Sequence, residues 1–174
     1  QTNASMNGDT LLTIDGDTAR IQMNQNIDRA WVRGARLEGQ ARLGPRATLR
    51  GVVNWTLGNS LEQGAQPLAH IPPTCGLLAW VQTHPRGRWS TTVRYALPKR
   101  AEDYGPGATD NLQEALPKGS PAWATWNVSG SWRLNDTLEI RVAAMNLLDL
   151  HYRTFGSGLS APGRNLRLTA TAQF

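Results

Sequence analysis

Residues 124–134 give the clearest indication of the fold, and they read Ala124-Thr125-Trp126-Asn127-Val128-Ser129-Gly130-Ser131-Trp132-Arg133-Leu134. Every second residue, starting with the first, is apolar or glycine, whereas the residues between them are Thr, Asn, Ser or Arg. Successive side chains of a β-strand point to opposite faces, so a period of two predicts a strand. This strand separates an apolar environment from a polar one.

The same alternation recurs along most of the chain and predicts an all-β protein. The further runs are Trp31 to Leu43, Ala47 to Gly58, Trp89 to Leu97, Leu138 to Met145, Leu166 to Phe174 and, as the weakest match, Leu77 to Gln82. About seven strands result, the first of which could start near Ala19. Ahead of them, Leu11 to Ile14 followed by Asp15-Gly16-Asp17 predicts a small extra hairpin.

The connections between these strands alternate strictly between short and long. The short ones are Gly44-Pro45-Arg46, His84-Pro85-Arg86-Gly87 and Asn135-Asp136, and the long ones are Asn59 to Pro73, Pro98 to Ala122 and Asp149 to Pro162. Outer-membrane barrels have short periplasmic turns and long extracellular loops. The pattern therefore favours an antiparallel up-and-down transmembrane β-barrel.

The residue types on the two faces favour lipid against the apolar face. The polar faces hold Thr, Ser, Asn, Gln and Arg without lysine, although a water-exposed sheet normally uses Lys and Glu. Trp89 and Trp132 lie beside tight turns, and Trp126 lies roughly 20 Å from Trp132 along one strand, which approaches the spacing of two aromatic girdles. The alternative is a soluble barrel with these tryptophans packed inside.

Charge and reactive side chains argue against several other classes of protein. The net charge of +5 comes almost wholly from singly spaced arginines, so we expect no nucleic-acid partner. The longest apolar stretch, Cys75 to Val81, is far shorter than the roughly 18 residues of a membrane-spanning helix. His70, His84 and His151 lie far apart and fit no catalytic motif, so we expect neither an enzyme, nor a metal site, nor a cofactor.

Four segments together resemble TonB-dependent outer-membrane receptors. Asn146-Leu147-Leu148-Asp149 with Tyr152-Arg153 resembles the penultimate strand of that family, and Pro162-Gly163-Arg164-Asn165 leading to Phe174 resembles its last strand. Trp31 to Glu38 and Pro67 to Pro73 are similar to a strand and a strand entry further upstream. The resemblance covers most of the chain in the expected order.

This resemblance implies a location in the outer membrane of a Gram-negative bacterium and a part in active uptake of a scarce nutrient, such as a ferric siderophore or a similar iron complex. It implies that residues 1–174 are the C-terminal part of a barrel, an incomplete one of about seven strands, with the plug domain absent from the chain. The implied partners are outer-membrane lipid, the TonB complex acting through the plug, the barrel-assembly machinery, which would read Phe174, and a small-molecule or metal-chelate substrate.

Two sets of candidate site residues follow. Exposed Arg and Tyr can bind an anionic, aromatic ligand by charge-assisted hydrogen bonds and stacking, although a solvated loop is the alternative. The loop candidates are Arg100, Asp103, Tyr104, Tyr152, Arg153 and Phe155. The candidates for the lumen and for plug contacts are Arg36, Glu38, Arg50, Arg94, Arg133, Glu139, Arg141 and Arg167. Two other functions remain open, a soluble β-barrel that binds an apolar ligand and a structural or adhesive outer-membrane barrel.

Overall fold

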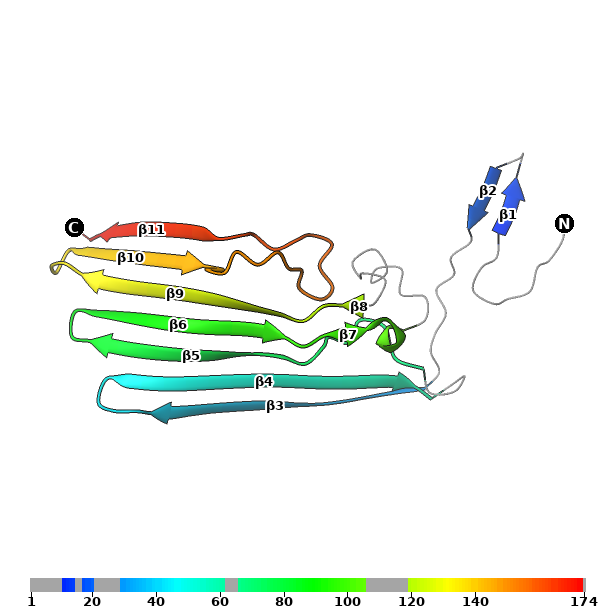
Figure 1. Ribbon diagram of the computed structural model, residues 1–174, viewed down its shortest axis with the longest axis horizontal. Helices are drawn as coiled ribbons and strands as arrows, with labels where there is room; N and C mark the ends of the chain where they lie inside the picture. Colours follow the sequence, from blue (N-terminus) through cyan, green and yellow to red (C-terminus); the bar gives the residue numbers. More distant parts are fainter. Residues whose placement is uncertain (1–10, 15–16, 21–28, 62–65, 106–118, 174) are drawn as a thin grey trace.

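The protein is built around one antiparallel sheet of seven strands in a computed structural model that describes residues 11–14, 17–20, 29–61, 66–105 and 119–173 (Figure 1). The strands of this sheet are β3 Ala30–Arg42, β4 Ala47–Ser60, β5 Cys75–His84, β6 Gly87–Ala96, β9 Trp123–Arg133, β10 Leu138–Met145 and β11 Asn165–Ala172. Their spatial order is β11-β10-β9-β6-β5-β4-β3. Each strand thus pairs with its neighbour in sequence within the sheet, as in an up-and-down barrel.

Smaller elements lie outside this sheet. β1 (Leu11–Ile14) and β2 (Asp17–Arg20) form the predicted hairpin, while β7 (Lys99–Arg100), the 3₁₀-helix η1 (Ala101–Asp103) and β8 (Gly119–Ser120) lie within one long loop. The large sheet begins at Ala30 and not near Ala19. Ala19 pairs with Leu12 instead, so its backbone is already used within the hairpin.

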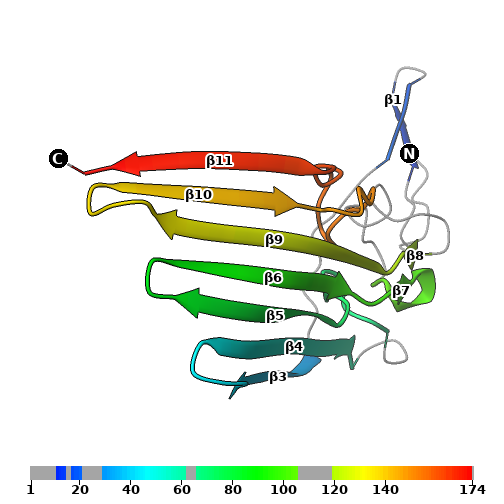
Figure 2. The same ribbon diagram turned by 60° about the vertical axis from the view of Figure 1, so that its left-hand side comes forward.

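The short connections lie at one end of the sheet and the long ones at the other (Figures 1 and 2). The tight turns are closed by backbone hydrogen bonds from Leu43 N to Ala47 O and from Leu134 N to Leu138 O, both 2.9 Å, and by the pairing of His84 with Gly87. The predicted alternation of turns and loops is therefore confirmed. We refer to the two ends as the tight-turn end and the long-loop end.

The register joins the polar faces of neighbouring strands into one surface. Arg36 pairs with Asn54, Thr92 with Asn127, and Arg141 with both Ser131 and Thr169. The apolar residues face the other side, where Leu49 pairs with Trp80, Leu78 with Val93, and Val142 with Leu168. We call these two surfaces the polar face and the apolar face.

The apolar face carries every tryptophan except Trp123, and its large side chains are uncovered. Trp55, Trp80, Trp89, Trp126 and Trp132 are 39–45% exposed, whereas Val52 on the polar face is only 3% exposed. The indole N–H of Trp126 donates to Thr91 Oγ1 at 2.6 Å, so its polar atom is satisfied inside the sheet. Trp126 can therefore face lipid without leaving an unsatisfied donor.

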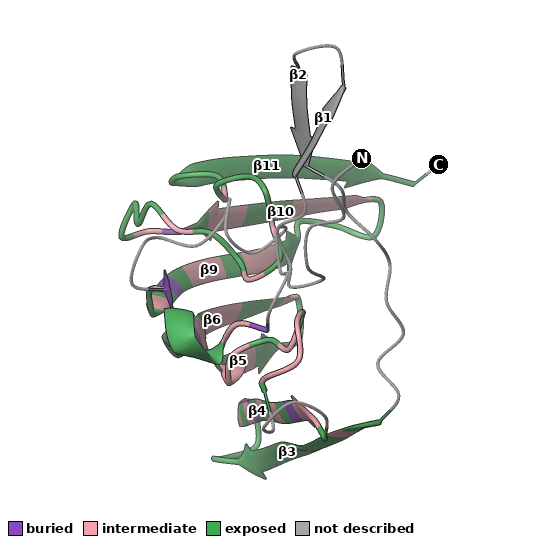
Figure 3. Cartoon of the chain, turned by 90° about the vertical axis from the view of Figure 1, so that its right-hand side faces the viewer, coloured by how far each residue is buried: buried purple, intermediate pink, exposed green. Residues whose placement is uncertain are grey.

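The two edges of the sheet are open among the described strands. β3 and β11 each pair on one side only; β11 is exposed along its length, and so is β3 apart from Trp31 (Figure 3). Closing a barrel leaves no such edges. The sheet is therefore part of a barrel wall, as predicted. None of the described residues forms a helix that is long and apolar enough to cross a bilayer.

One close approach within the sheet depends on glycine. A Cβ at Gly76 in β5 would lie 2.1 Å from the carbonyl oxygen of Val52 in β4 and 2.8 Å from the hydroxyl of Tyr95. No side chain fits at these distances, so only glycine allows β4, β5 and β6 to pair at this point.

Candidate functional site

The polar face brings together all the residues predicted to face the lumen. By register, Arg36, Glu38 and Arg50 lie on its β3–β4 side. The others are Arg94, Arg133, Glu139, Arg141 and Arg167, on β6, β9, β10 and β11. Their position on one face of the sheet is a finding. That this face lines the lumen, and that it contacts a plug, stay predictions.

Glu38 is the centre of a charged network on this face. Its carboxylate accepts hydrogen bonds from Arg36 Nη2 at 2.9 Å, from Arg50 Nη2 at 2.6 Å and from Arg50 Nε at 3.0 Å. Arg36 Nη1 also donates to Asn54 Oδ1 at 3.0 Å. One carboxylate thus orients two guanidinium groups on neighbouring strands, although all three side chains remain in contact with solvent.

A second charged group lies at the other side of the face. Arg141 Nε donates to Glu139 Oε1 at 2.6 Å, and both line a polar hollow of about 510 Å³ together with Ser129, Arg167 and Thr169. Arg94, Arg133 and Arg167 form no ion pair among the described residues. The face therefore offers unpaired positive charge to whatever it contacts.

The long-loop end is held by Asn146, the residue that follows β10. Asn146 is 4% exposed and has a left-handed φ of 50°. Its Nδ2 donates to the carbonyl oxygens of Leu150 and Pro162 at 2.9 and 3.2 Å, while its Oδ1 accepts from Leu150 N at 3.0 Å. Asp149 Oδ1 accepts from Arg164 N at 2.7 Å. The Asn-Leu-Leu-Asp segment therefore fixes both ends of loop 149–162.

Two long loops meet through aromatic side chains. Tyr104 and Phe155 stack with ring centroids 6.0 Å apart, and the Lys99 ammonium lies 5.4 and 4.7 Å from the two centroids. Lys99 Nζ also donates to the carbonyl oxygen of Ile71, which belongs to the third long loop. We call Lys99, Tyr104, Phe155 and Ile71 the loop cluster.

Burial changes the acidity of the central lysine. Lys99 is 8% exposed, and desolvation lowers its pKa below the usual value, while nearby Asp103 acts in the opposite direction. Neighbouring Arg100 is exposed, and its hydrogen bond to Glu102 Oε1 at 3.0 Å raises its pKa. The cluster thus keeps a cation under two aromatic rings, where cation–π attraction compensates part of the desolvation.

The structure brings together some of the predicted loop residues and separates others. Tyr104 and Phe155 are in contact, but Tyr152 packs against Trp123 in a tilted arrangement, with ring centroids 4.5 Å apart. Arg153 Nε donates to Ser160 Oγ at 3.3 Å and remains exposed, as does Arg100. The aromatic residues therefore pack the loops onto each other, and the two arginines point to solvent.

Sequence reasoning missed Trp123 and gave Lys99 no role. Trp123 is the first residue of β9 and lies on the polar face. In the sequence, its position next to a long loop was the one feature that could have indicated a contact with loop residues. Among the described residues, no group of His, Cys, Asp and Glu is arranged to hold a metal ion.

Comparison with known families identifies the chain. The family model "TonB dependent receptor-like, beta-barrel" matches residues 2–147, which is most of the sequence. The chain belongs to the TonB-dependent receptor family. TonB-dependent receptors are transporters, not enzymes, and they reside in the outer membrane of Gram-negative bacteria.

Solved structures agree with this TonB-dependent receptor fold. The chain resembles a solved structure described as "Copper transporter OprC" with a TM-score of 0.68 and 15% sequence identity. The match covers 83% of this chain but only 23% of OprC. No curated protein sequence matches the chain. At this identity the likeness concerns the fold alone.

The segments that resembled TonB-dependent receptors in sequence have defined places in the structure. Asn146 to Asp149 forms the hydrogen-bonded corner that fixes loop 149–162, and Trp31 to Glu38 lies within β3. Pro67 pairs with Asn59 in an isolated bridge ahead of β5. Phe174 lies outside the described residues, so its role in barrel assembly stays a prediction.

Proposed function

We propose that this chain supplies barrel wall and ligand-facing loops to a TonB-dependent importer of a ferric siderophore or a similar iron complex. In this proposal residues 1–174 form the C-terminal part of the barrel, and the plug that couples to TonB belongs to another part of the receptor. Family membership supports uptake in general. The loop chemistry supports the substrate class.

The observation that carries the substrate class is the arrangement of the long-loop end. Arg100 and Arg153 are exposed, and at the same end Tyr104 packs on Phe155 and Tyr152 packs on Trp123. An end of the barrel that presents both guanidinium groups and aromatic rings suits an anionic ligand with flat rings, because charge-assisted hydrogen bonds and stacking can act together.

The polar face supports the assignment to a lumen wall. It carries the Glu38 network and several unpaired arginines, whereas tryptophans and leucines cover the opposite face. A soluble barrel that stores an apolar ligand would place those tryptophans inside. Membership of the TonB-dependent receptor family, whose barrels lie in the outer membrane, argues against that alternative.

Uptake by the whole receptor tests the proposal. Cells that express the complete reading frame are supplied with radioactive iron bound to a catecholate siderophore, with a strain lacking TonB as the energy control. We expect accumulation that requires TonB and falls at least severalfold in an Arg100→Gln, Arg153→Gln double variant. Arg29→Gln, an exposed arginine at the same end, serves as the matched control.

Copper supplied under the same conditions distinguishes the substrates. TonB-dependent accumulation of copper without accumulation of the iron complex would contradict the siderophore assignment and leave the transporter assignment intact. Accumulation of neither in the presence of TonB would contradict both.

A further inference from the structure

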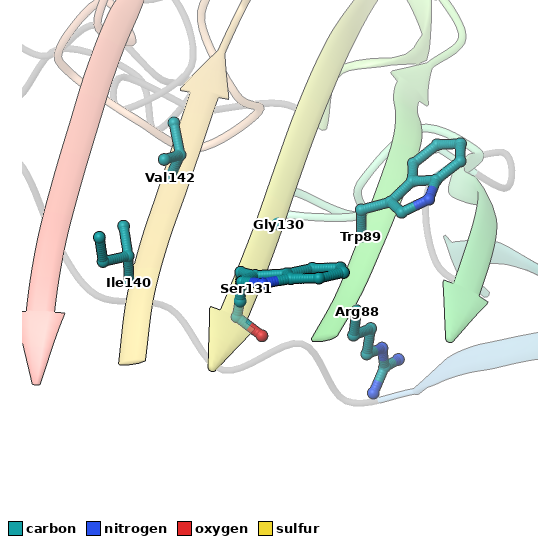
Figure 4. A pocket seen from close by; sticks show the side chains of 7 residues that line it. Arg88, Trp89, Gly130, Ser131, Ile140 and Val142 are labelled. Atoms are coloured by element: carbon teal, nitrogen blue, oxygen red, sulfur yellow. The ribbon is translucent and has the colours of Figure 1, made fainter. Parts of the chain in front are cut away.

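The apolar face contains a groove at the tight-turn end. Gly130 of β9 forms its floor, Trp89 of β6 lies on one side, and Ile140 and Val142 of β10 lie on the other (Figure 4). Trp132 also lines the groove, whose volume is about 230 Å³. The groove faces the lipid side of the sheet.

The groove ends beside a group of arginines in the tight turns. The ring of Trp132 stacks on His84 with centroids 5.0 Å apart, and Arg86 is two residues further along the same turn. Arg46 lies in the adjacent turn, since its carbonyl oxygen accepts from Thr83 N at 2.8 Å. The turn that holds Arg86 also contacts the end of β9, because Arg133 N donates to Arg86 O at 2.7 Å.

These turn arginines have no partner of their own. The guanidinium groups of Arg46 and Arg86 are exposed and make no ion pair or hydrogen bond within the described residues. Asp136 is the one acidic residue in the three tight turns. Arg36, Arg50 and Arg141 further along the strands pair with carboxylates, whereas Arg94, Arg133 and Arg167 on the polar face form no ion pair within the described residues.

We propose that this region binds one anionic phospholipid of the periplasmic leaflet, with an acyl chain in the groove at Gly130 and its phosphate at Arg46 and Arg86. Three observations agree with this occupant. The groove is apolar and opens to lipid, it lies between tryptophans at interfacial depth, and unpaired positive charge lies just beyond it. The proposal concerns the outer side of the barrel and is independent of the nutrient carried.

The geometry also explains why residue 130 is glycine. A Cβ at Gly130 would lie 3.4 Å from Trp89 Cβ, which is ordinary contact, so the backbone does not require glycine here. A larger side chain would fit the sheet but would occupy the groove. Substitution of Gly130 should therefore change lipid binding while the strands remain paired.

Native mass spectrometry of the purified complete receptor tests the site, with phosphatidylglycerol and phosphatidylcholine of identical acyl chains as probes. We expect wild type to retain phosphatidylglycerol in preference to phosphatidylcholine, by about fivefold for each of the two arginines. The Arg46→Gln, Arg86→Gln variant should lose this preference while still retaining both lipids. Arg29→Gln, at the opposite end, should keep it.

Gly130→Leu should reduce the retention of both lipids severalfold. Gly51→Leu is the matched control, because Gly51 lies on the same face and its nearest neighbour to a Cβ is Leu78 Cδ1 at 3.8 Å. Equal retention of the two lipids by wild type, or retention by Gly130→Leu equal to that by Gly51→Leu, overturns the proposal. Because the arginine variants change only exposed turn residues, they test the phosphate site even where Gly130→Leu assembles poorly.

Discussion

Asn127, in the middle of β9, accepts a hydrogen bond on its Oδ1 from the backbone N–H of Asn146 at 2.9 Å. The neighbouring N–H of Leu147 donates to the Trp126 carbonyl oxygen, also at 2.9 Å. Asn146 and Leu147, which follow the end of β10, thus remain hydrogen-bonded to β9. Asn146 then binds both ends of loop 149–162 through its own side chain.

Asn146→Ala should release this loop. The change removes three hydrogen bonds from the Asn146 side chain to backbone groups of Leu150 and Pro162, and each such bond contributes about 0.5–1.5 kcal/mol. Alanine also tolerates the left-handed φ of 50° less well than asparagine. Limited proteolysis of intact cells should cut residues 149–162 faster in this variant. Asn165→Ala, which removes only a long hydrogen bond of 3.4 Å, should behave like wild type.

Gly76→Ala should impair barrel assembly, because the new Cβ would meet the Val52 carbonyl oxygen, which cannot move without breaking the pairing of β4 and β5. Gly51→Ala is the matched change, since a Cβ there meets nothing closer than 3.8 Å. The fraction of receptor that shows heat-modifiable mobility on a gel measures assembly. Equal folded fractions for the two variants would refute the packing account of Gly76.

The strands and their faces could be predicted because period two is a local signal. Ala124 to Leu134 alternates without exception, and the structure forms β9 there with the expected faces. β5 was the weakest prediction for a physical reason. On the polar face it carries Cys75, Leu77, Ala79 and Val81, so both of its faces are apolar and the alternation disappears.

The arrangement of the loops could not be read from the sequence. The contact of Tyr104 with Phe155 joins residues from two separate loops, and the pairing of Lys99 with Ser120 closes one of them. Neither contact has a periodic or spacing signal. The sequence resemblance did locate Asn146 to Asp149, but the hydrogen bonds that explain the segment depend on where β9 and β11 lie.

Lys99 should titrate below the usual lysine value of 10.5. Because burial lowers the folded pKa, the unfolded chain binds more protons between that pKa and 10.5, and the loop cluster gains stability as pH rises through this window. Carbon-13 methylation of lysines allows the midpoint to be followed by NMR, with Lys99→Arg assigning the signal and urea-denatured protein as the reference. A midpoint at or above the denatured value would contradict the burial of Lys99.

Glu38→Gln should destabilise the receptor more when the plug is present than when it is removed. On an open face the ion pairs with Arg36 and Arg50 are screened by water, and such pairs contribute little. Under a plug the same arginines would lose their compensating charge in a drier environment. Thermal unfolding midpoints are measured for wild type and Glu38→Gln, each with and without the plug. An equal shift with and without the plug would show that the plug does not cover this network.

The orientation of the sheet is tested most directly by nitroxide labels at Val93 and Thr92, neighbours in β6 on the apolar and polar faces. The labels are placed one at a time on the complete receptor in bilayers, with Cys75 replaced by alanine. Collision with dissolved oxygen reports lipid, and collision with a water-soluble nickel chelate reports water. We predict high oxygen and low nickel accessibility at Val93, and lower oxygen accessibility at Thr92. High nickel accessibility at Val93 together with high oxygen accessibility at Thr92 would contradict the account.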